Sequence, residues 1–402
     1  MTEPPGAGKL LLPRSAWRGG EAGGLPVSDT VSGQHRLMSL DVFRGLTMAA
    51  MVIVNNPGDW GAVYAPLLHA EWHGWTPTDL VFPFFLYSVG VSMTLSSSTL
   101  GPWGRILRRT AVIAGLGLFL AGFPRFPLAT WRIPGVLQRI AVCYLAAVCI
   151  FRATAGPGGR NGLRHAFRLG WWIVGLLVSY AAVMVLVPVP GGGAGDMSPA
   201  GNVGAFIDRT LMGNHLWQRR PWDPEGILST VPAIGTTLVG VITGLWLRAK
   251  ASPSGKVVGL VVGGVALMIL GELWGLSFPI NKNLWTSSYV LFTAGAAGVV
   301  LAACYWLIDV RGWKTWGKPL VILGRNAITL FVVSGLLTKV LVTIRVALPD
   351  GITTSLYRYL FLTVYAPLLA PKNASLLFAL THPLLLFAVL ALLHRRRIYL
   401  RA

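Results

Sequence analysis

The chain has 402 residues, of which 54% are hydrophobic and only 12% are charged, and its formal net charge is +20. Soluble domains carry about 25% charged residues, so this composition excludes an ordinary water-soluble fold and indicates a membrane protein. The basic excess does not indicate nucleic acid as a partner, because the Lys and Arg residues are spread over short loops between apolar runs, as in proteins that cross a lipid bilayer.

The first 35 residues are rich in Gly, Pro, Ser and Arg and contain no apolar run like that of a signal peptide. Such a composition buries too little apolar surface to fold. We therefore predict a disordered cytoplasmic tail over residues 1–35 and one transmembrane domain over residues 36–402.

Runs of about 18 or more uncharged residues indicate transmembrane helices. Such runs recur from residue 38 onward, and we predict an all-α polytopic membrane protein with about ten transmembrane helices. They are expected near residues 38–55, 79–98, 106–123, 134–151, 168–188, 227–248, 256–274, 284–308, 319–341 and 374–394. The three cysteines, Cys143, Cys149 and Cys304, fall inside these runs, so we interpret them as packed thiols and predict no metal site.

One further apolar stretch, residues 356–370, is interrupted by Arg358 and Pro367 and is short for a span. With a cytoplasmic N-terminus, ten spans keep the basic cluster at residues 395–397 cytoplasmic, whereas an eleventh span would move it outside. Cytoplasmic loops are enriched in Lys and Arg. We therefore predict that this stretch does not span and that both termini are cytoplasmic.

Ionisable and amide side chains in or beside membrane spans are costly, so each is a candidate functional residue. On the predicted topology these residues gather at the outer ends of the first, second, fourth, sixth and eighth spans. They are Asn55, His69, Asp79, Arg139, Glu225, Lys282 and Asn283, with Trp285 beside them. Five segments that contribute cations, anions and amides to one membrane face predict a single polar site, which suits a polar neutral or amine substrate.

Each of these residues also has a structural interpretation. Asp79 and Glu225 precede helices, where a carboxylate caps free N–H groups and favours the positive end of the helix dipole. Arg139 could stabilise the bundle by pairing with either carboxylate, and a single histidine such as His69 is often only an interfacial residue. We assign three other histidines to structural positions: His73 and His215 at the surface, and His382 inside the last span.

Several sequence motifs occur together and in order along the chain. They are LDVFRGLTM (40–48), the stretch from VNN to HAEWHGWTPTDLVFPFF (54–85), RIPGVLQRI (132–140), DPEGILST (223–230) and FPINKNLWTSSY (278–289). These motifs resemble the catalytic domain of the heparan-α-glucosaminide N-acetyltransferase family, transmembrane enzymes that acetylate a terminal glucosamine from acetyl-CoA. The resemblance implies a bacterial member of the family, a multi-pass protein of the inner membrane, whose essential histidine is His69 and whose asparagine partner is Asn55.

The resemblance also implies an acetyl-CoA-dependent acetyltransferase with an amino sugar or glycoconjugate as acceptor. His69 would be the general base or the nucleophile, and Asn55 would supply an N–H donor to the oxyanion. Substrate contacts are expected from Asp79, Arg139, Glu225, Lys282, Asn283 and Trp285. Phosphate contacts to CoA are expected from basic residues of the inner face: Arg44, Arg108, Arg109, Arg311, Lys314 and Arg325.

Three alternatives remain open at this point. The sequence does not choose between direct transfer and an acetyl-histidine intermediate, and it leaves a homodimer open. A transporter or flippase of a sugar or lipid-linked sugar could use the same polar residues as a binding site. Internal repeats and broken helices near the middle of the membrane are typical of transporters. We find no convincing repeat, and the polar residues lie at helix ends, so we favour the enzyme.

Overall fold

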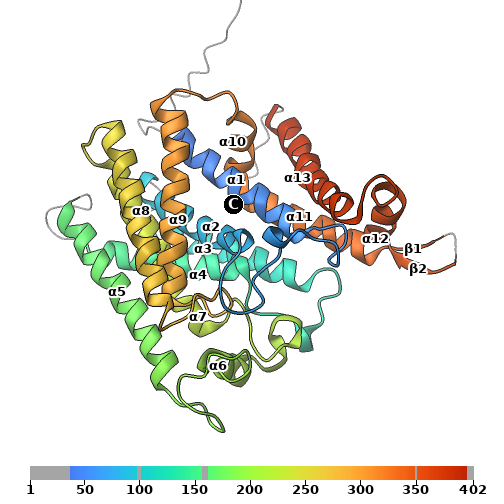
Figure 1. Ribbon diagram of the computed structural model, residues 1–402, viewed down its shortest axis with the longest axis horizontal. Helices are drawn as coiled ribbons and strands as arrows, with labels where there is room; N and C mark the ends of the chain where they lie inside the picture. Colours follow the sequence, from blue (N-terminus) through green and yellow to red (C-terminus); the bar gives the residue numbers. More distant parts are fainter. Residues whose placement is uncertain (1–36, 97–100, 156–161, 349–350, 396–402) are drawn as a thin grey trace, which may run out of the picture. The chain divides into compact units, whose positions relative to one another are not determined.

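The protein is described here by a computed structural model, shown in Figure 1, which covers residues 37–96, 101–155, 162–348 and 351–395. The predicted disordered tail, residues 1–35, lies outside the described residues. The prediction of an all-α fold is confirmed apart from one short hairpin, in which β1 (Arg345–Ala347) pairs antiparallel with β2 (Thr353–Ser355).

The described residues form thirteen α-helices, many of them long and apolar (Figure 1). They are α1 (Met38–Asn55), α2 (Val81–Leu95), α3 (Trp103–Gly122), α4 (Val136–Ala153), α5 (Leu163–Leu186), α6 (Val203–Met212), α7 (Ile227–Arg248), α8 (Pro253–Gly275), α9 (Ser287–Tyr305), α10 (Lys318–Arg325), α11 (Ala327–Thr343), α12 (Leu356–Leu360) and α13 (Pro371–Arg395).

Eight stretches of the described chain are long and apolar enough to cross a membrane, or nine if one bent pair counts as a single span. They are Met38–Asn55, Pro77–Leu95, Val136–Ala153, Leu163–Leu186, Ile227–Arg248, Pro253–Gly275, Ser287–Val310 and Pro371–Leu392. The prediction of about ten spans was therefore too high.

Two predicted spans account for the difference. The span expected near 106–123 is the helix α3, but any 18-residue stretch of α3 includes Arg105, Arg108 and Arg109, too many charges for a typical span. The span expected near 319–341 is broken into α10 and α11, whose axes differ by 79°. The Asn326 side chain donates to the carbonyl oxygen of Ile322 at 2.9 Å at this break, a local bond that competes with continuation of the helix.

The stretch 356–370 is not among the candidate spans found in the described residues. It contains α12 and one π-helical segment, η8 (Phe361–Tyr365), and it packs against α13. Cys143 and Cys304 are buried as predicted, whereas Cys149 is exposed on α4, so the prediction that it is a packed thiol was wrong.

The helices α2, α7 and α9 are the most deeply buried candidate spans, whereas only a small part of α5 and α8 is buried. Glycines allow α2 and α7 to approach closely, because a Cβ atom at Gly90 would lie 2.0 Å from the carbonyl oxygen of Thr237. A Cβ atom at Gly240 would likewise lie 2.1 Å from the carbonyl oxygen of Tyr87. This central packing supports the polar loops at one end of the helices.

Candidate functional site

The loop between α1 and α2 carries His69. The helix α1 ends at Asn55, since Pro57 disfavours a helical conformation in the residue before it. The loop then forms one turn of 3-10 helix, η1 (Ala65–Leu67), and a second one, η2 (Pro77–Leu80), which leads directly into α2. His69 therefore lies between two short helical turns and projects from the end of the helical bundle.

Asp79 organises this loop and also contacts the imidazole. Its Oδ2 atom accepts hydrogen bonds from the backbone N–H groups of Ala70 and Thr76, each at 3.0 Å. Its Oδ1 atom lies 2.6 Å from Nδ1 of His69. The Asp79 side chain is only 1% exposed, whereas the His69 side chain is 46% exposed. A buried carboxylate at Nδ1 keeps the proton on that nitrogen, so that Nε2 is the nitrogen that can accept a proton.

Lys282 is the second partner of His69. Its Nζ atom lies 3.1 Å from Nε2 and 3.0 Å from Nδ1 of His69, and 3.7 Å from Oδ1 of Asp79. Burial lowers the pKa of the Lys282 ammonium, although the charges of Asp79 and Glu225 act in the opposite direction. The imidazole thus has a carboxylate at Nδ1 and an amine that lies about equally close to both of its nitrogens.

Two buried residues, Asn281 and Trp285, fix the turn that carries Lys282. The Oδ1 atom of Asn281 accepts from the N–H of Leu284 at 2.9 Å, and the Asn281 side chain is completely buried. Trp285 has a left-handed backbone (φ 53°) and a buried indole whose Nε1–H donates to the Thr236 hydroxyl at 3.1 Å. Trp285 therefore supports the turn and does not present its ring to a substrate.

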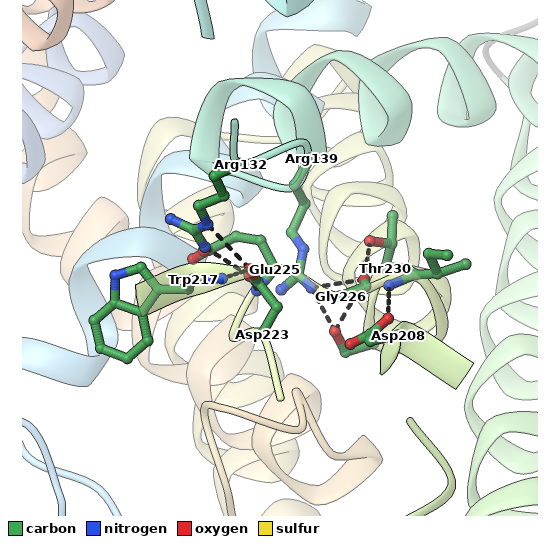
Figure 2. Close-up of polar contacts among 10 residues, drawn as sticks. Arg132, Arg139, Asp208, Trp217, Asp223, Glu225, Gly226 and Thr230 are labelled. Atoms are coloured by element: carbon green, nitrogen blue, oxygen red, sulfur yellow. Dashed lines mark hydrogen bonds and ion pairs between the residues drawn. The ribbon is translucent and has the colours of Figure 1, made fainter. Parts of the chain in front are cut away.

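Arg132 joins two acidic residues that precede α7 (Figure 2). Its Nε and Nη2 atoms donate to the two oxygens of Asp223 at 3.0 and 2.6 Å, and Nη2 also pairs with Glu225. Burial disfavours the guanidinium charge, but Glu225 and Asp223 outweigh it and raise the pKa of Arg132. Asp223 also accepts from the N–H of Trp217 at 2.7 Å, which fixes the preceding turn.

Arg139 does not pair with Asp79 or Glu225, contrary to the structural interpretation of the sequence. It is 2% exposed and donates to the carbonyl oxygen of Gly226 at 3.2 Å and to Ser229 (Figure 2). Its guanidinium lies 5.0 Å from the centre of the Trp285 ring. Arg139 thus connects the loop before α7 to the turn that carries Lys282, because it bonds the first and stacks on the second.

The other end of the His69 loop is bound to the C-terminal part of the chain. The Ser375 hydroxyl lies 3.1 Å from both the N–H and the carbonyl oxygen of Asp59, and the N–H of Gly58 donates to the Ser375 carbonyl at 3.3 Å. The Tyr357 hydroxyl donates to the carbonyl oxygen of Pro57 at 2.9 Å. These contacts fix residues 57–59 against α12 and the start of α13.

Two other predicted site residues lie less centrally. Asn55 is exposed at the end of α1, and its side chain makes no hydrogen bond to His69 in the described part of the chain. Asn283 is half-buried in the 281–286 turn, in which its neighbour Asn281 is the residue that makes the fixing bonds. His73 is exposed and lies 3.4 Å from Nδ2 of Asn281, consistent with its assignment to the surface.

The basic residues predicted to contact CoA lie at the opposite ends of the helices, and several already have partners. Arg109 stacks on Tyr144 and Arg311 stacks on Trp306, each at 5.0 Å from the ring centre. Nε of Arg325 lies 3.6 Å from Oδ2 of Asp41. The remaining three lie on or beside the same segments: Arg44 half-buried, and Arg108 and Lys314 exposed.

Residues 36–158 match the family model described as heparan-alpha-glucosaminide N-acetyltransferase, catalytic. The chain is related to this acetyltransferase family. The human heparan-alpha-glucosaminide N-acetyltransferase is 31% identical in an alignment of 354 residues that covers 74% of this chain and 52% of the human protein. The mouse protein of the same name is 32% identical over 355 residues, which cover 75% of this chain and 53% of the mouse protein. The chain spans about half the length of the curated relatives that it matches.

The segment that matches the acetyltransferase family model contains Asn55, His69, Asp79 and Arg139, whereas Lys282 lies beyond it. The structure brings Lys282 to the imidazole from a turn more than 200 residues away, at 3.0 Å. Arg132 lies in the RIPGVLQRI motif (132–140) but was not among the predicted site residues. The sequence signal for this cluster is an Arg just before α4, Arg132, together with two carboxylates just before α7, Asp223 and Glu225.

Proposed function

We propose that the protein transfers an acetyl group from acetyl-CoA to the amine of an amino sugar or glycoconjugate, with His69 as the general base. The observation that carries the proposal is the carboxylate–imidazole pair, with Oδ1 of Asp79 2.6 Å from Nδ1 of His69. A base whose Nδ1 is fixed in this way can accept a proton from an amine at Nε2, the nitrogen that also lies 3.1 Å from Nζ of Lys282. The relationship to the acetyltransferase family supports the choice of donor and reaction.

In the proposed reaction the acceptor nitrogen attacks the carbonyl carbon of the thioester while its proton moves to Nε2 of His69. The negative charge that develops on the carbonyl oxygen needs nearby donors. The Lys282 ammonium and the Asn55 amide are the proposed donors. The carbon–sulfur bond then breaks, and the proton on the imidazole passes to the sulfur of CoA. Asp79 remains ionised and stabilises the imidazolium that forms in between.

We further propose that acetyl-CoA approaches from the cytoplasmic side of a bacterial inner membrane and that the acceptor is bound at the outer face. The basic residues Arg44, Arg108, Arg325 and Lys314 would attract the CoA phosphates at the inner end. Asp79 contacts His69 and the charge of Glu225 acts on Lys282, and this negative charge favours a substrate that carries an amine. The distinct acceptor and donor ends account for polar residues at both ends of the helices.

One feature of the fold is also typical of transporters: the 79° break between α10 and α11. Product formation separates the two functions. Purified protein in detergent is incubated with acetyl-CoA labelled in the acetyl group and with a panel of amino sugars, and acetylated products are identified by mass spectrometry. Label in an N-acetyl sugar supports the enzyme, and its absence for every acceptor, with sugar uptake into proteoliposomes, would support the transporter.

Variants of three residues test the assignment of the base. A general base contributes about 10²–10⁴-fold in rate, so His69→Ala is expected to lose at least that much. Asn55→Ala is expected to lose less than His69→Ala, about 10²–10³-fold, since one oxyanion donor is removed. His73→Ala is the matched control, an exposed histidine four residues away, and is expected to remain near wild type. A larger loss for His73→Ala than for His69→Ala would place the base elsewhere.

A further inference from the structure

The amine of Lys282 occupies the position that an acceptor amine must reach. Its Nζ atom lies 3.1 Å from Nε2 of His69, the nitrogen that accepts the proton in the proposed reaction, and 3.0 Å from Nδ1. The Lys282 side chain is 18% exposed, so Nζ is held beside the imidazole and does not extend into solvent. The buried Asn281 and Trp285 fix the turn that carries it. The protein therefore contains its own amine within hydrogen-bond distance of the base.

Other lysines of the described chain lack this relationship to His69. Lys372 is exposed at the start of α13, with Nζ 5.9 Å from the centre of the Tyr64 ring. Lys339 on α11 donates to carbonyl oxygens of Leu120 and Phe123 at 2.6 and 2.9 Å. A reagent in solution would modify the exposed Lys372 more readily than Lys282. Preferential acetylation of Lys282 would consequently require the active site.

We propose that Lys282 is a self-acetylation site: when acetyl-CoA is bound and no acceptor is present, the acetyl group is transferred to Nζ of Lys282. This inference rests on the proposed acetyltransferase function. The neutral Nζ attacks the carbonyl carbon of the thioester, a carbon–nitrogen bond forms, and the carbon–sulfur bond breaks. The proton released by Nζ passes through Nε2 of His69 to the sulfur, so the products are an acetamide side chain and free CoA thiol.

Two features of the site bear on how readily this reaction occurs. Burial lowers the pKa of Lys282 and increases the fraction of the neutral, nucleophilic amine. The carboxylate of Asp79, 3.7 Å from Nζ, favours the ammonium form and slows the reaction. Self-acetylation is thus expected to be slower than transfer to a bound acceptor and to become faster as the pH rises.

Acetylation of Lys282 would inactivate the enzyme for two physical reasons. It removes the positive charge that faces Asp79 and that is available to the oxyanion, and it leaves a bulkier neutral group beside Nε2. A bound acceptor amine competes with Lys282 for the acetyl group and therefore protects the enzyme. The site would couple the active fraction of the enzyme to the supply of acceptor.

The experiment measures acetylation of individual lysines by peptide mass spectrometry. The full chain in detergent is incubated with acetyl-CoA that carries a deuterated acetyl group, without acceptor, and Lys372 serves as the reference for spontaneous chemistry. We expect label on Lys282 to exceed label on Lys372 by at least 10-fold. We expect His69→Ala to reduce label on Lys282 at least 100-fold with Lys372 unchanged, because a general base contributes about 10²–10⁴-fold.

Addition of glucosamine is expected to slow labelling of Lys282 while N-acetylglucosamine accumulates. Label on Lys282 no greater than on Lys372, or equal label in His69→Ala and wild type, would overturn the inference. N-acetylglucosamine formed without label on Lys282 would overturn the self-acetylation alone and leave the proposed function in place. Failure to label either the sugar or Lys282 would overturn both.

Discussion

Replacement of Asp79 by Asn changes one carboxylate oxygen into an NH2 group and so changes the partner of His69. In the wild type, Oδ2 accepts from the N–H groups of Ala70 and Thr76 at 3.0 Å, and Oδ1 faces Nδ1 of His69. The amide oxygen of Asn has to take the first position, because an NH2 group there would oppose two N–H donors. The NH2 group then faces Nδ1 of His69 and donates to it.

This orientation reverses the tautomer of the imidazole. Nδ1 becomes the acceptor, the proton moves to Nε2, and Nε2 can no longer accept a proton from the substrate amine. The opposite orientation of the amide leaves two partly buried N–H groups unsatisfied, at a cost of about 1–3 kcal/mol each. The two together cost about 2–6 kcal/mol, and since about 1.4 kcal/mol corresponds to a factor of ten, the productive tautomer is populated about 30-fold to 10⁴-fold less. The loop keeps its backbone bonds, so Asp79→Asn is expected to fold.

The measurement is kcat for acetyl transfer to the best amino-sugar acceptor, together with the thermal midpoint in detergent. We expect kcat to fall about 10²–10⁴-fold with a nearly unchanged midpoint. Asp196→Asn is a suitable control, because Asp196 accepts from the N–H of Ser198 in an exposed turn between α5 and α6. A kcat for Asp79→Asn within threefold of wild type would refute the role of Asp79 in fixing the imidazole.

Two further predictions concern the surroundings of the site. Burial raises the pKa of Asp208 from 3.8 to about 6, so the stabilising contribution of its protonated form is complete below pH 3.8 and is lost as the pH rises through 6. Asp208→Asn is therefore expected to be more stable than wild type by about 1–3 kcal/mol at pH 7.5 and equal to it near pH 4. Thermal melts that show no such pH dependence would contradict this prediction. Tyr357→Phe, which removes the bond to Pro57, is expected to lower kcat about 10-fold with little change in KM for acetyl-CoA, because small misplacements of catalytic groups are costly. Tyr365→Phe is its matched control, since that hydroxyl bonds Thr381 instead, and equal effects of the two variants would argue against positioning of the His69 loop by Tyr357.

Much of the helical architecture could be predicted from hydropathy, because an apolar run of span length has few alternatives in a membrane. The first predicted span, 38–55, coincides with Met38–Asn55. Hydropathy alone does not detect a bend, and α10 and α11 together form one continuous apolar pattern. The break depends on a side-chain bond of Asn326 and on the close approach of Gly324 to the Asp41 carbonyl, contacts that only the folded chain reveals.

The set of residues that form the site could largely be predicted from the sequence, but not which side chains contact each other. Polar residues at helix ends identified His69, Asp79 and Lys282 as neighbours in one region, and the structure places their polar atoms within 3.7 Å of one another. The choice between Asn281 and Asn283 depends on the direction in which each side chain points within one tight turn. Sequence spacing does not determine this, because Trp285 adopts a left-handed backbone conformation that changes the course of the turn.

In the His69 loop, one residue, Asp79, serves both the folding of the loop and the proposed chemistry. Asp79 accepts two backbone bonds that shape residues 70–76, caps the start of η2 and contacts the imidazole, all with one carboxylate. Its structural role as a helix cap and its proposed catalytic role are therefore not alternatives, because the cap fixes the carboxylate in the orientation that the imidazole requires. Lys282 differs, since no backbone group of the loop depends on its amine. A change at Lys282 should for this reason affect chemistry more than folding, whereas removal of the Asp79 side chain should affect both.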